Sequence, residues 1–227
     1  MTVPYYVPPE QLMKDRAEFA RKGIARGRSI VALEYADGIL LMAENPSGAL
    51  YKIGEIYDRI AFAGVGKYNE FEALRVAGVR HADLKGYAYA REDVTAKGLA
   101  NAYSQSLGHI FTQEVKPYEV EIMVAEVGRL PADNRLFRVT YDGTLYDERH
   151  FCAIGGQDER LNSLLEAGFE ENAPLGTAIR LAGEAFTASG DREIPPEEWE
   201  AAVIDRTLGR RTFRRLRTDE IAATGSP

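Results

Sequence analysis

The chain has 227 residues, of which 45% are hydrophobic and 28% charged, as expected of a globular protein with one large domain or two small ones. Its net charge of -7 argues against a general nucleic-acid-binding protein. The single cysteine, Cys152, excludes an intrachain disulfide and a multi-cysteine metal site. Cys152 lies in an apolar, strand-like run, and we interpret it as a core residue rather than a nucleophile.

Nothing in the sequence indicates a metal, a cofactor or a membrane. The three histidines show no close metal-ligand spacing. No stretch approaches the roughly 20 apolar residues that are needed to span a bilayer. The chain does not open on a charged and then apolar signal peptide either, so we expect a cytoplasmic protein.

An uncharged tail opens the chain, and Pro8-Pro9 separates it from a helix predicted to begin at Glu10. Proline suits a first helical position because its missing N–H would have no partner there. Gly23 is predicted to end this helix. The apolar residues of the helix recur at spacings of four, three and four, at Met13, Ala17, Ala20 and Ile24.

Two blocks of strands then alternate with two pairs of helices, and a further block of strands ends the fold. The strands are apolar on both faces, as in sheets covered on both sides. They are predicted at 29–33, 39–43, 50–53, 59–65, 119–125, 135–141, around 145, 151–154, 200–204 and 212–216. Helical stripes of apolar residues cover 71–82, 99–111, 161–169 and 175–186.

Segregated strand and helix blocks favour an α+β fold over a parallel α/β sheet. Two stacked antiparallel sheets, each covered outside by helices, would bury all of these apolar faces. We therefore predict a four-layer αββα sandwich, with an extra N-terminal helix, over residues 10–216. Residues 1–9 and 217–227 are expected to be flexible tails.

Two sequence features suggest ligands but have simpler explanations. Gly64-Val65-Gly66-Lys67 resembles a phosphate-binding loop, yet Ala61 replaces the first glycine and Tyr68 the magnesium-binding hydroxyl. Glycines at a strand-to-helix turn instead allow a close approach of backbones. The arginines between Arg210 and Arg217 are interpreted as a solvated face. A nucleic-acid-binding module remains the alternative, and its affinity would fall steeply with salt.

Six stretches, taken together in this order and spacing, resemble proteasome subunits, and the actinobacterial α subunit in particular. The similarity runs from about residue 8 to about residue 216. The resemblance implies the αββα sandwich of the N-terminal-nucleophile hydrolases, the arrangement that the elements predict independently. The stretches are Lys22–Ser29, Ala43–Ser47, Leu50–Arg59, Gly64–Phe71, Lys116–Glu121 and Tyr141–Gly143.

Within this family, the residues before the first strand distinguish the catalytic β type from the α type. A β subunit needs Gly-Thr there, because cleavage frees the threonine amine that activates the hydroxyl nucleophile. The chain has Arg26-Gly27-Arg28-Ser29 instead, with Arg28 near the position of the nucleophile. Together with the N-terminal helix, this implies an α-type subunit without catalytic residues. The alternative is a β-type threonine peptidase with a displaced nucleophile.

The resemblance also implies roles for particular residues. Lys52 and Gly66 match a pocket between neighbouring subunits that receives the C-terminal tail of an ATPase activator; otherwise Lys52 is a surface lysine on a short strand. The apolar stripe at Met13, Ala17, Ala20 and Ile24 is expected to contact the neighbouring subunit. The segment that closes the pore would be Thr2, Val3, Pro4, Tyr5, Tyr6, Val7 and Pro8. This segment lacks the Tyr-Asp-Arg of archaeal and eukaryotic α subunits.

The implied partners follow from the α assignment. Seven copies would form a ring that caps a ring of proteasome β subunits. A ring-shaped AAA+ ATPase would dock on the α ring, and tagged proteins would pass through it for degradation. Neither nucleic acid nor membrane is an expected partner.

Overall fold

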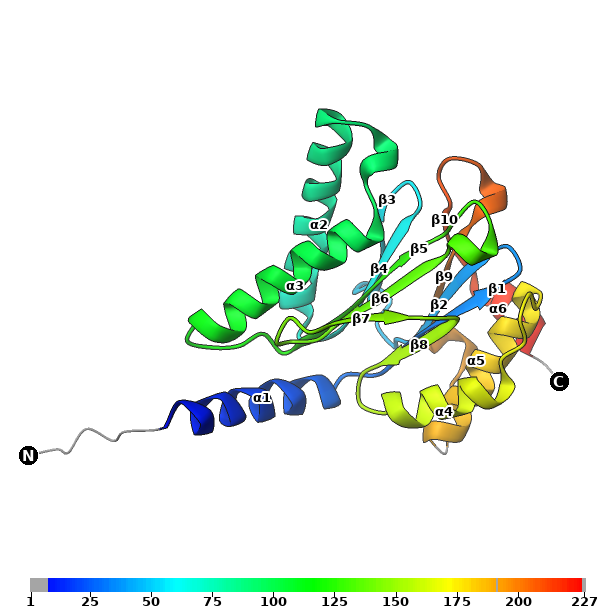
Figure 1. Cartoon of the computed structure of the whole chain (residues 1–227). Coiled ribbons are helices and arrows are strands. Elements are labelled where there is room, and N and C mark those ends of the chain that lie inside the picture. Colours follow the sequence, from blue (N-terminus) through cyan, green and yellow to red (C-terminus); the bar gives the residue numbers. More distant parts are fainter. Residues whose placement is uncertain (1–7, 191, 226–227) are drawn as a thin grey trace, which may run out of the picture.

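The computed structural model describes residues 8–190 and 192–225 (Figure 1). Two five-stranded sheets, in which every pairing is antiparallel, lie face to face, and helices cover their outer faces. The predicted α+β class and four-layer αββα sandwich are therefore confirmed.

The first sheet, sheet A, has the strand order β10-β9-β2-β1-β8. It therefore joins strands from the beginning, the middle and the end of the chain. Its strands are β1 (Ile30–Tyr35), β2 (Gly38–Glu44), β8 (Phe151–Ile154), β9 (Trp199–Asp205) and β10 (Phe213–Arg215).

The second sheet, sheet B, has the order β3-β4-β5-β6-β7, so its neighbours are consecutive in the chain. Its strands are β3 (Ile53–Tyr57), β4 (Ile60–Gly66), β5 (Val120–Glu126), β6 (Arg135–Val139) and β7 (Leu145–Glu148). The strand predicted at 50–53 is therefore shifted. Leu50 and Tyr51 are exposed loop residues, and pairing with β4 begins only at Ile53.

Helices form the two outer layers. The helices α2 (Tyr68–Ala88) and α3 (Ala96–Gln113) cover sheet B, whereas α4 (Asp158–Gly168) and α5 (Leu175–Gly190) cover sheet A. Four single-turn 3-10 helices lie in the connections, at Arg91–Asp93, Pro131–Asp133, Pro196–Glu198 and Arg206–Leu208. None of the helices within the described ranges combines the length and the apolar character that crossing a membrane requires.

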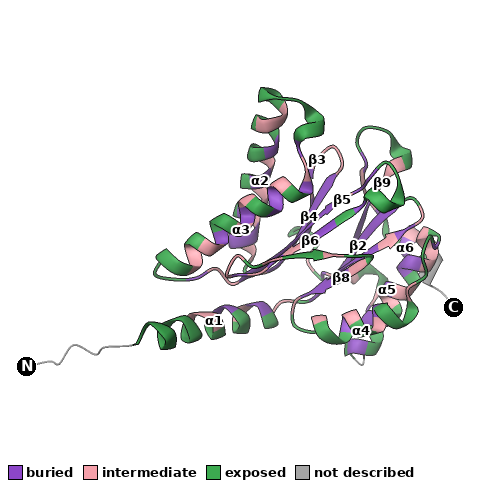
Figure 2. Cartoon of the chain, in the orientation of Figure 1, coloured by how far each residue is buried: buried purple, intermediate pink, exposed green. Residues whose placement is uncertain are grey.

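Strand alternation divides the core into three layers of buried side chains, and buried residues line most of the strands (Figure 2). Because successive strand residues point to opposite faces, Ile30 and Ala32 enter the layer between the two sheets. Val31 and Leu33 instead pack beneath α4 and α5. Phe62 of sheet B packs under α2 and α3. Burial on both faces of each sheet explains why the sequence shows apolar runs rather than a simple alternation.

The N-terminal helix α1 (Pro9–Ala25) projects from the sandwich, and only its C-terminal half packs against the sheets (Figure 1). Pro8 is its N-cap residue, so the helix begins one residue before the predicted Glu10. Gly23 does not end the helix. A Cβ at this position would overlap the Glu119 side chain, so Gly23 serves close packing rather than termination.

The prediction of a loose C-terminal tail from 217 onward is wrong. Residues Thr218–Gly225 form the helix α6, which packs beside α5. Its one large apolar side chain, Ile221, is buried against the outer layer of sheet A. Glu220 also accepts hydrogen bonds from the Arg214 guanidinium (2.7 Å) and the Arg217 N–H (2.8 Å), which fixes the first turn of the helix.

Candidate functional site

Lys52 lies where the α1–β1 connection, the end of β2 and the start of β3 meet. Its ammonium donates hydrogen bonds to the main-chain carbonyls of Arg28 (2.9 Å) and Glu44 (3.1 Å). Burial lowers the pKa of Lys52 to about 8, although the nearby Glu200 carboxylate favours the charged form. The group is therefore mostly an ammonium at pH 7 but loses its charge within a unit or two above.

Gly66 lies at the same end of sheet B as Lys52. Lys52 immediately precedes β3, and Gly66 ends β4, its antiparallel neighbour. The Lys52 carbonyl accepts a hydrogen bond from Gly64 N (3.1 Å), which fixes the two chains side by side. The backbone of Gly66 has a φ of 107°, and a Cβ there would overlap the Glu119 carbonyl, so the position requires glycine.

The turn that connects α1 to β1 lies beside Lys52 and Gly66. A Cβ built on Gly27 would lie 3.1 Å from the Gly66 nitrogen, so the Arg26–Arg28 turn passes directly beside the end of β4. Lys52 and Gly66 therefore lie at the same end of sheet B, beside this turn. The structure adds Arg28 to them, through its carbonyl contact with Lys52.

A hollow of about 360 Å³ opens on the other side of this turn. Basic side chains border it at Arg26, Arg28 and Arg192, and Phe186 and Ile194 supply an apolar wall. Arg28 and Arg192 both pair with Glu44, and both lie near Glu198. Within residues 8–190 and 192–225, no group of acidic, histidine or cysteine side chains could hold a metal ion.

Glu200 organises the backbone around Lys52, and sequence reasoning did not identify it. The loop before β3 starts with an Asx turn, in which Asn45 Oδ1 accepts from Ser47 N (3.0 Å). Glu200 Oε2 then accepts from Asn45 Nδ2 (2.7 Å) and Lys52 N (2.9 Å). The available signal was an acidic residue inside the otherwise apolar run of β9.

The position expected for a catalytic nucleophile contains no activated group. The Lys52 ammonium faces the carbonyl of Arg28, whose chain continues into α1. The Ser29 hydroxyl is buried and accepts a hydrogen bond from Gln157 N (3.3 Å), and its own backbone nitrogen is an amide. Burial raises the pKa of the Cys152 thiol, so the thiol is not activated either and is a core residue, as predicted.

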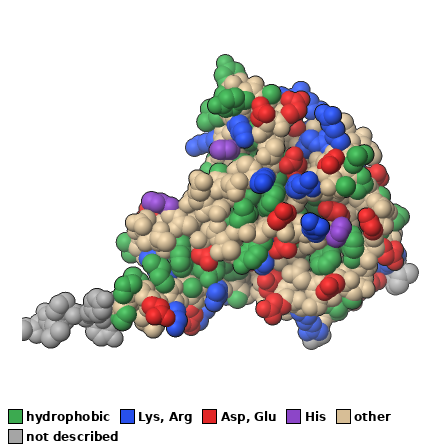
Figure 3. Space-filling view, in the orientation of Figure 1, with side chains coloured by type: hydrophobic (Ala, Val, Ile, Leu, Met, Phe, Trp, Pro, Cys, Tyr) green, Lys and Arg blue, Asp and Glu red, His purple; other side chains and the backbone are tan. Residues whose placement is uncertain are grey.

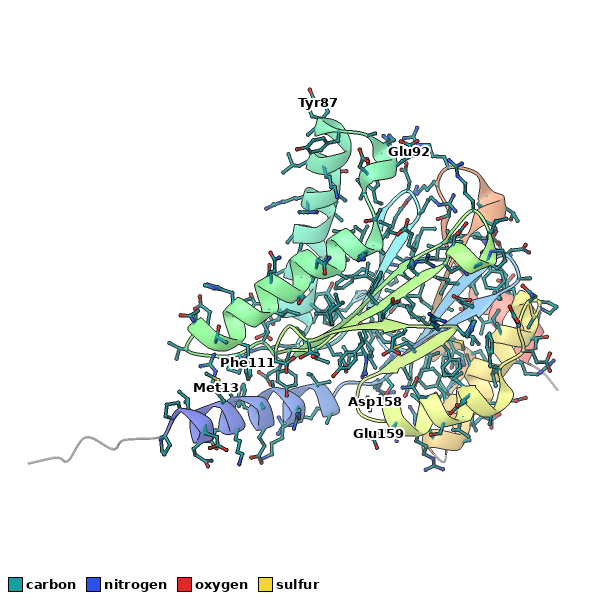
Figure 4. All side chains as sticks on the ribbon, viewed as in Figure 1. Met13, Tyr87, Glu92, Phe111, Asp158 and Glu159 are labelled. Atoms are coloured by element: carbon teal, nitrogen blue, oxygen red, sulfur yellow. The ribbon has the colours of Figure 1, made fainter. Side chains whose placement is uncertain are left out.

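The helix stripe predicted to contact a neighbouring subunit is mostly buried within the chain itself. Ala20 and Ile24 are only 0% and 7% exposed, because they pack into the layer between the two sheets. Ala17 is partly buried against the same layer, and Met13 is exposed on the side toward Phe111 of α3 (Figure 4). Ala20 and Ile24 therefore cannot form a subunit contact, and that part of the prediction is wrong.

A different apolar surface of α1 is about half exposed, and Lys116 Nζ lies over its Phe19 ring (5.4 Å). Leu12 and Phe19 are 45% and 46% exposed, and they lie seven residues apart on the flank of the helix. The space-filling view shows hydrophobic side chains along the projecting part of α1 (Figure 3). We define Leu12 and Phe19 as the α1 flank. The predicted pore segment Thr2–Val7, by contrast, lies outside the described residues.

The arginines of the last strand do not form an uncompensated basic surface. Each of the five has an acidic partner in the described structure. The pairs are Arg210–Asp58, Arg211–Glu55, Arg214–Glu220, Arg215–Glu200 and Arg217–Asp219. This arrangement agrees with the interpretation as a solvated face and gives no support to nucleic-acid binding.

Comparison with known proteins gives one consistent result. A family model described as proteasome subunit matches residues 24–204.

Curated relatives that carry the name "Proteasome subunit alpha" include the following three. The protein of Kineococcus radiotolerans is 58% identical over 224 residues, which cover 95% of this chain and 94% of the relative. The Acidothermus cellulolyticus protein is 59% identical over 221 residues, with the same coverage. The Thermomonospora curvata protein is 54% identical over 230 residues, covering 100% of both chains. The chain therefore belongs to the proteasome subunit family, as an α-type member of the actinobacterial kind.

Proposed function

We propose that this chain is a non-catalytic subunit that forms the outer ring of a proteasome core, docks an ATPase activator and controls entry to the proteolytic chamber. The observation that carries the proposal is the contact between Lys52 and Arg28. In a β subunit the equivalent lysine tunes a threonine, whereas here its ammonium meets a main-chain carbonyl. An ammonium held in this way is suited to receive a terminal carboxylate.

The isolated chain is expected to have no peptidase activity, because Arg28 replaces the nucleophile and Ser29 has no free amine. The measurement is turnover of fluorogenic peptides by the purified chain, with and without Ser29→Ala. Activity that survives repurification and disappears in Ser29→Ala would show that a displaced nucleophile exists, and the chain would then be a β-type peptidase.

The docking site would be built from Lys52, Gly66 and the Arg26–Arg28 turn. Its ligand would be the C-terminal carboxylate of a ring-shaped AAA+ ATPase. The charge of Lys52 fits the carboxylate, and Gly66, which the Glu119 carbonyl of the same chain already requires, lies beside it.

Assembly would use α1. Seven copies in a ring need a heterologous contact that closes on itself. The α1 flank, Leu12 and Phe19, supplies an exposed apolar surface on an element that projects beyond the sandwich. One face of the ring would meet the proteasome β subunits, and the other would receive the ATPase and the tagged proteins destined for degradation.

Entry would be controlled by the segment Thr2–Pro8, which precedes α1. Its sequence has two tyrosines, two valines and two prolines but no charged side chain. In a ring, seven such segments would converge on one pore, and their high local concentration favours mutual contact. Tyr5 and Tyr6 would supply the bulk of the plug.

Deleting residues 2–7 while keeping Pro8 is therefore expected to raise the peptide hydrolysis of the assembled particle without an activator. Folding and assembly should be unchanged, because Pro8 still caps α1 and no core residue is removed. The measurement compares unstimulated hydrolysis by matched particles with identical β subunits. Equal rates for the two particles would mean that this segment does not limit entry.

A further inference from the structure

We propose that Glu200 is a positioning residue for activator docking, whose buried carboxylate fixes the main chain at Lys52 and supplies a negative charge close to its ammonium. The inference rests on the proposed docking role of Lys52. It assigns a function at this site to a residue of β9, in sheet A.

The carboxylate of Glu200 accepts four hydrogen bonds beside the start of β3. Oε2 accepts from Asn45 Nδ2 (2.7 Å) and from Lys52 N (2.9 Å). Oε1 accepts from Ile53 N (2.9 Å) and from the Arg215 guanidinium (3.1 Å). The side chain is only 6% exposed, so these bonds are sheltered from water. One acid thus fixes the main chain on both sides of the bond between Lys52 and Ile53, and with it the point from which the lysine side chain starts.

The same carboxylate also acts on the charge of Lys52. The ammonium donates only to neutral carbonyls, those of Arg28 and Glu44, which do not by themselves offset the loss of water. Burial accordingly lowers the pKa of Lys52 to about 8, and Glu200 is the group that opposes this shift. Without the carboxylate, the lysine would lose its proton closer to neutral pH, and a neutral amine cannot pair with a terminal carboxylate.

The other charged groups around Lys52 leave Glu200 as the effective anion. On the α1–β1 connection, Arg28 adds a positive charge, and Glu44 at the end of β2 pairs with both Arg28 and Arg192. Glu198, in the turn before β9, lies near the same two arginines. On β10, Arg215 pairs with Glu200 and offsets part of its charge.

The experiment measures activator docking between pH 6 and pH 9 for assembled particles that carry the unmodified chain or Glu200→Gln. Unmodified docking should decline above about pH 8, where Lys52 loses its proton. In Glu200→Gln the midpoint should fall to lower pH, so docking at pH 8.5 should be several-fold weaker than in the unmodified particle. The two should converge near pH 6. Glu55→Gln removes a carboxylate from β3 that pairs with Arg211 instead, and it should leave the profile unchanged.

Two further measurements distinguish this effect from misfolding: a variant expected to shift the docking midpoint in the opposite direction, and a direct titration of Lys52. Arg215→Gln removes the cation that partly neutralises Glu200, so the docking midpoint should rise, by less than it falls in Glu200→Gln. NMR titration of lysine labelled at Cε in the full-length chain, with Lys52 assigned from Lys52→Ala, should give the same two directions without any activator.

The outcomes separate this inference from the docking role itself. Docking that is unchanged in Lys52→Ala would refute the role of Lys52. If Lys52→Ala weakens docking but Glu200→Gln leaves both the strength and the pH profile of docking unchanged, only the role of Glu200 is wrong. An unchanged Lys52 titration in folded Glu200→Gln would refute it as well.

Discussion

Replacing Lys52 by alanine is expected to weaken ATPase docking by about ten- to a hundredfold. A hydrogen bond to a charged group contributes about 1.5–3 kcal/mol, which corresponds to that change in affinity. An ammonium has three N–H groups, and the contacts to Arg28 and Glu44 use two of them. The third remains for an incoming carboxylate, so the lysine can bind its ligand without giving up the contacts that orient it.

The measurement is ATPase-dependent degradation of a tagged protein at limiting activator, together with small-peptide hydrolysis by the same particles. Only the first should fall, because peptides do not need the activator. Lys97→Ala, which removes an exposed lysine from α3, is the matched control and should behave like the unmodified chain. Unaltered degradation in a folded Lys52→Ala particle would remove Lys52 from the docking site.

The layers of the fold could be predicted because strands that are buried on both faces are apolar at successive positions. Runs such as Ile39–Ala43 are apolar at every position, and the structure buries them between a second sheet and two helices. Segregated blocks of strands and helices were then enough to choose the sandwich. The first strand of sheet B was misplaced because Leu50 and Tyr51 have strand-like side chains but lie in an exposed loop fixed by Asn45.

Only part of the candidate site was predicted from the sequence. Lys52 and Gly66 came from the resemblance, and their adjacency follows from neighbouring antiparallel strands. Glu200 did not emerge, because it is 148 residues from Lys52 and meets it only when sheet A stacks on sheet B. The helix α6 was missed because Ile221 is its one large apolar residue, and one such residue produces no periodicity.

The stripe on α1 shows a limit of periodicity. The spacing of Met13, Ala17, Ala20 and Ile24 correctly indicates that one face of the helix is covered. It does not indicate what covers it. In the structure, the chain's own layer between the two sheets covers the C-terminal half of this stripe. The α1 flank, Leu12 and Phe19, lies on another side of the helix and remains exposed.

Two neighbouring substitutions on α1 are expected to have opposite effects on folding and assembly. Ala20→Asp places an unpaired carboxylate in the layer between the sheets, where Ala20 is fully buried. Burying a charge without a partner costs several kcal/mol, which should lower the melting temperature of the chain by roughly 10 °C or more. Phe19→Asp adds the same charge to a half-exposed position, where the change loses the contact of the Phe19 ring with Lys116 Nζ (5.4 Å) and should cost no more than about 1 kcal/mol.

Phe19→Asp should nevertheless prevent ring assembly if the α1 flank is the seam. Each closed contact would then bury a carboxylate against an apolar neighbour, and the penalty recurs at every contact of the ring.

The measurements are thermal melting of the isolated chain and light scattering of mixtures with β subunits. Gln11→Asp, on the side of α1 opposite the buried stripe, adds an equal charge, loses only an exposed hydrogen bond from Gln11 to Asp15 (2.6 Å) and should assemble normally. If Phe19→Asp forms particles as completely as Gln11→Asp does, the α1 flank is not the seam. If Ala20→Asp instead melts normally but fails to assemble, the packing of α1 against its own sheets is not what holds Ala20.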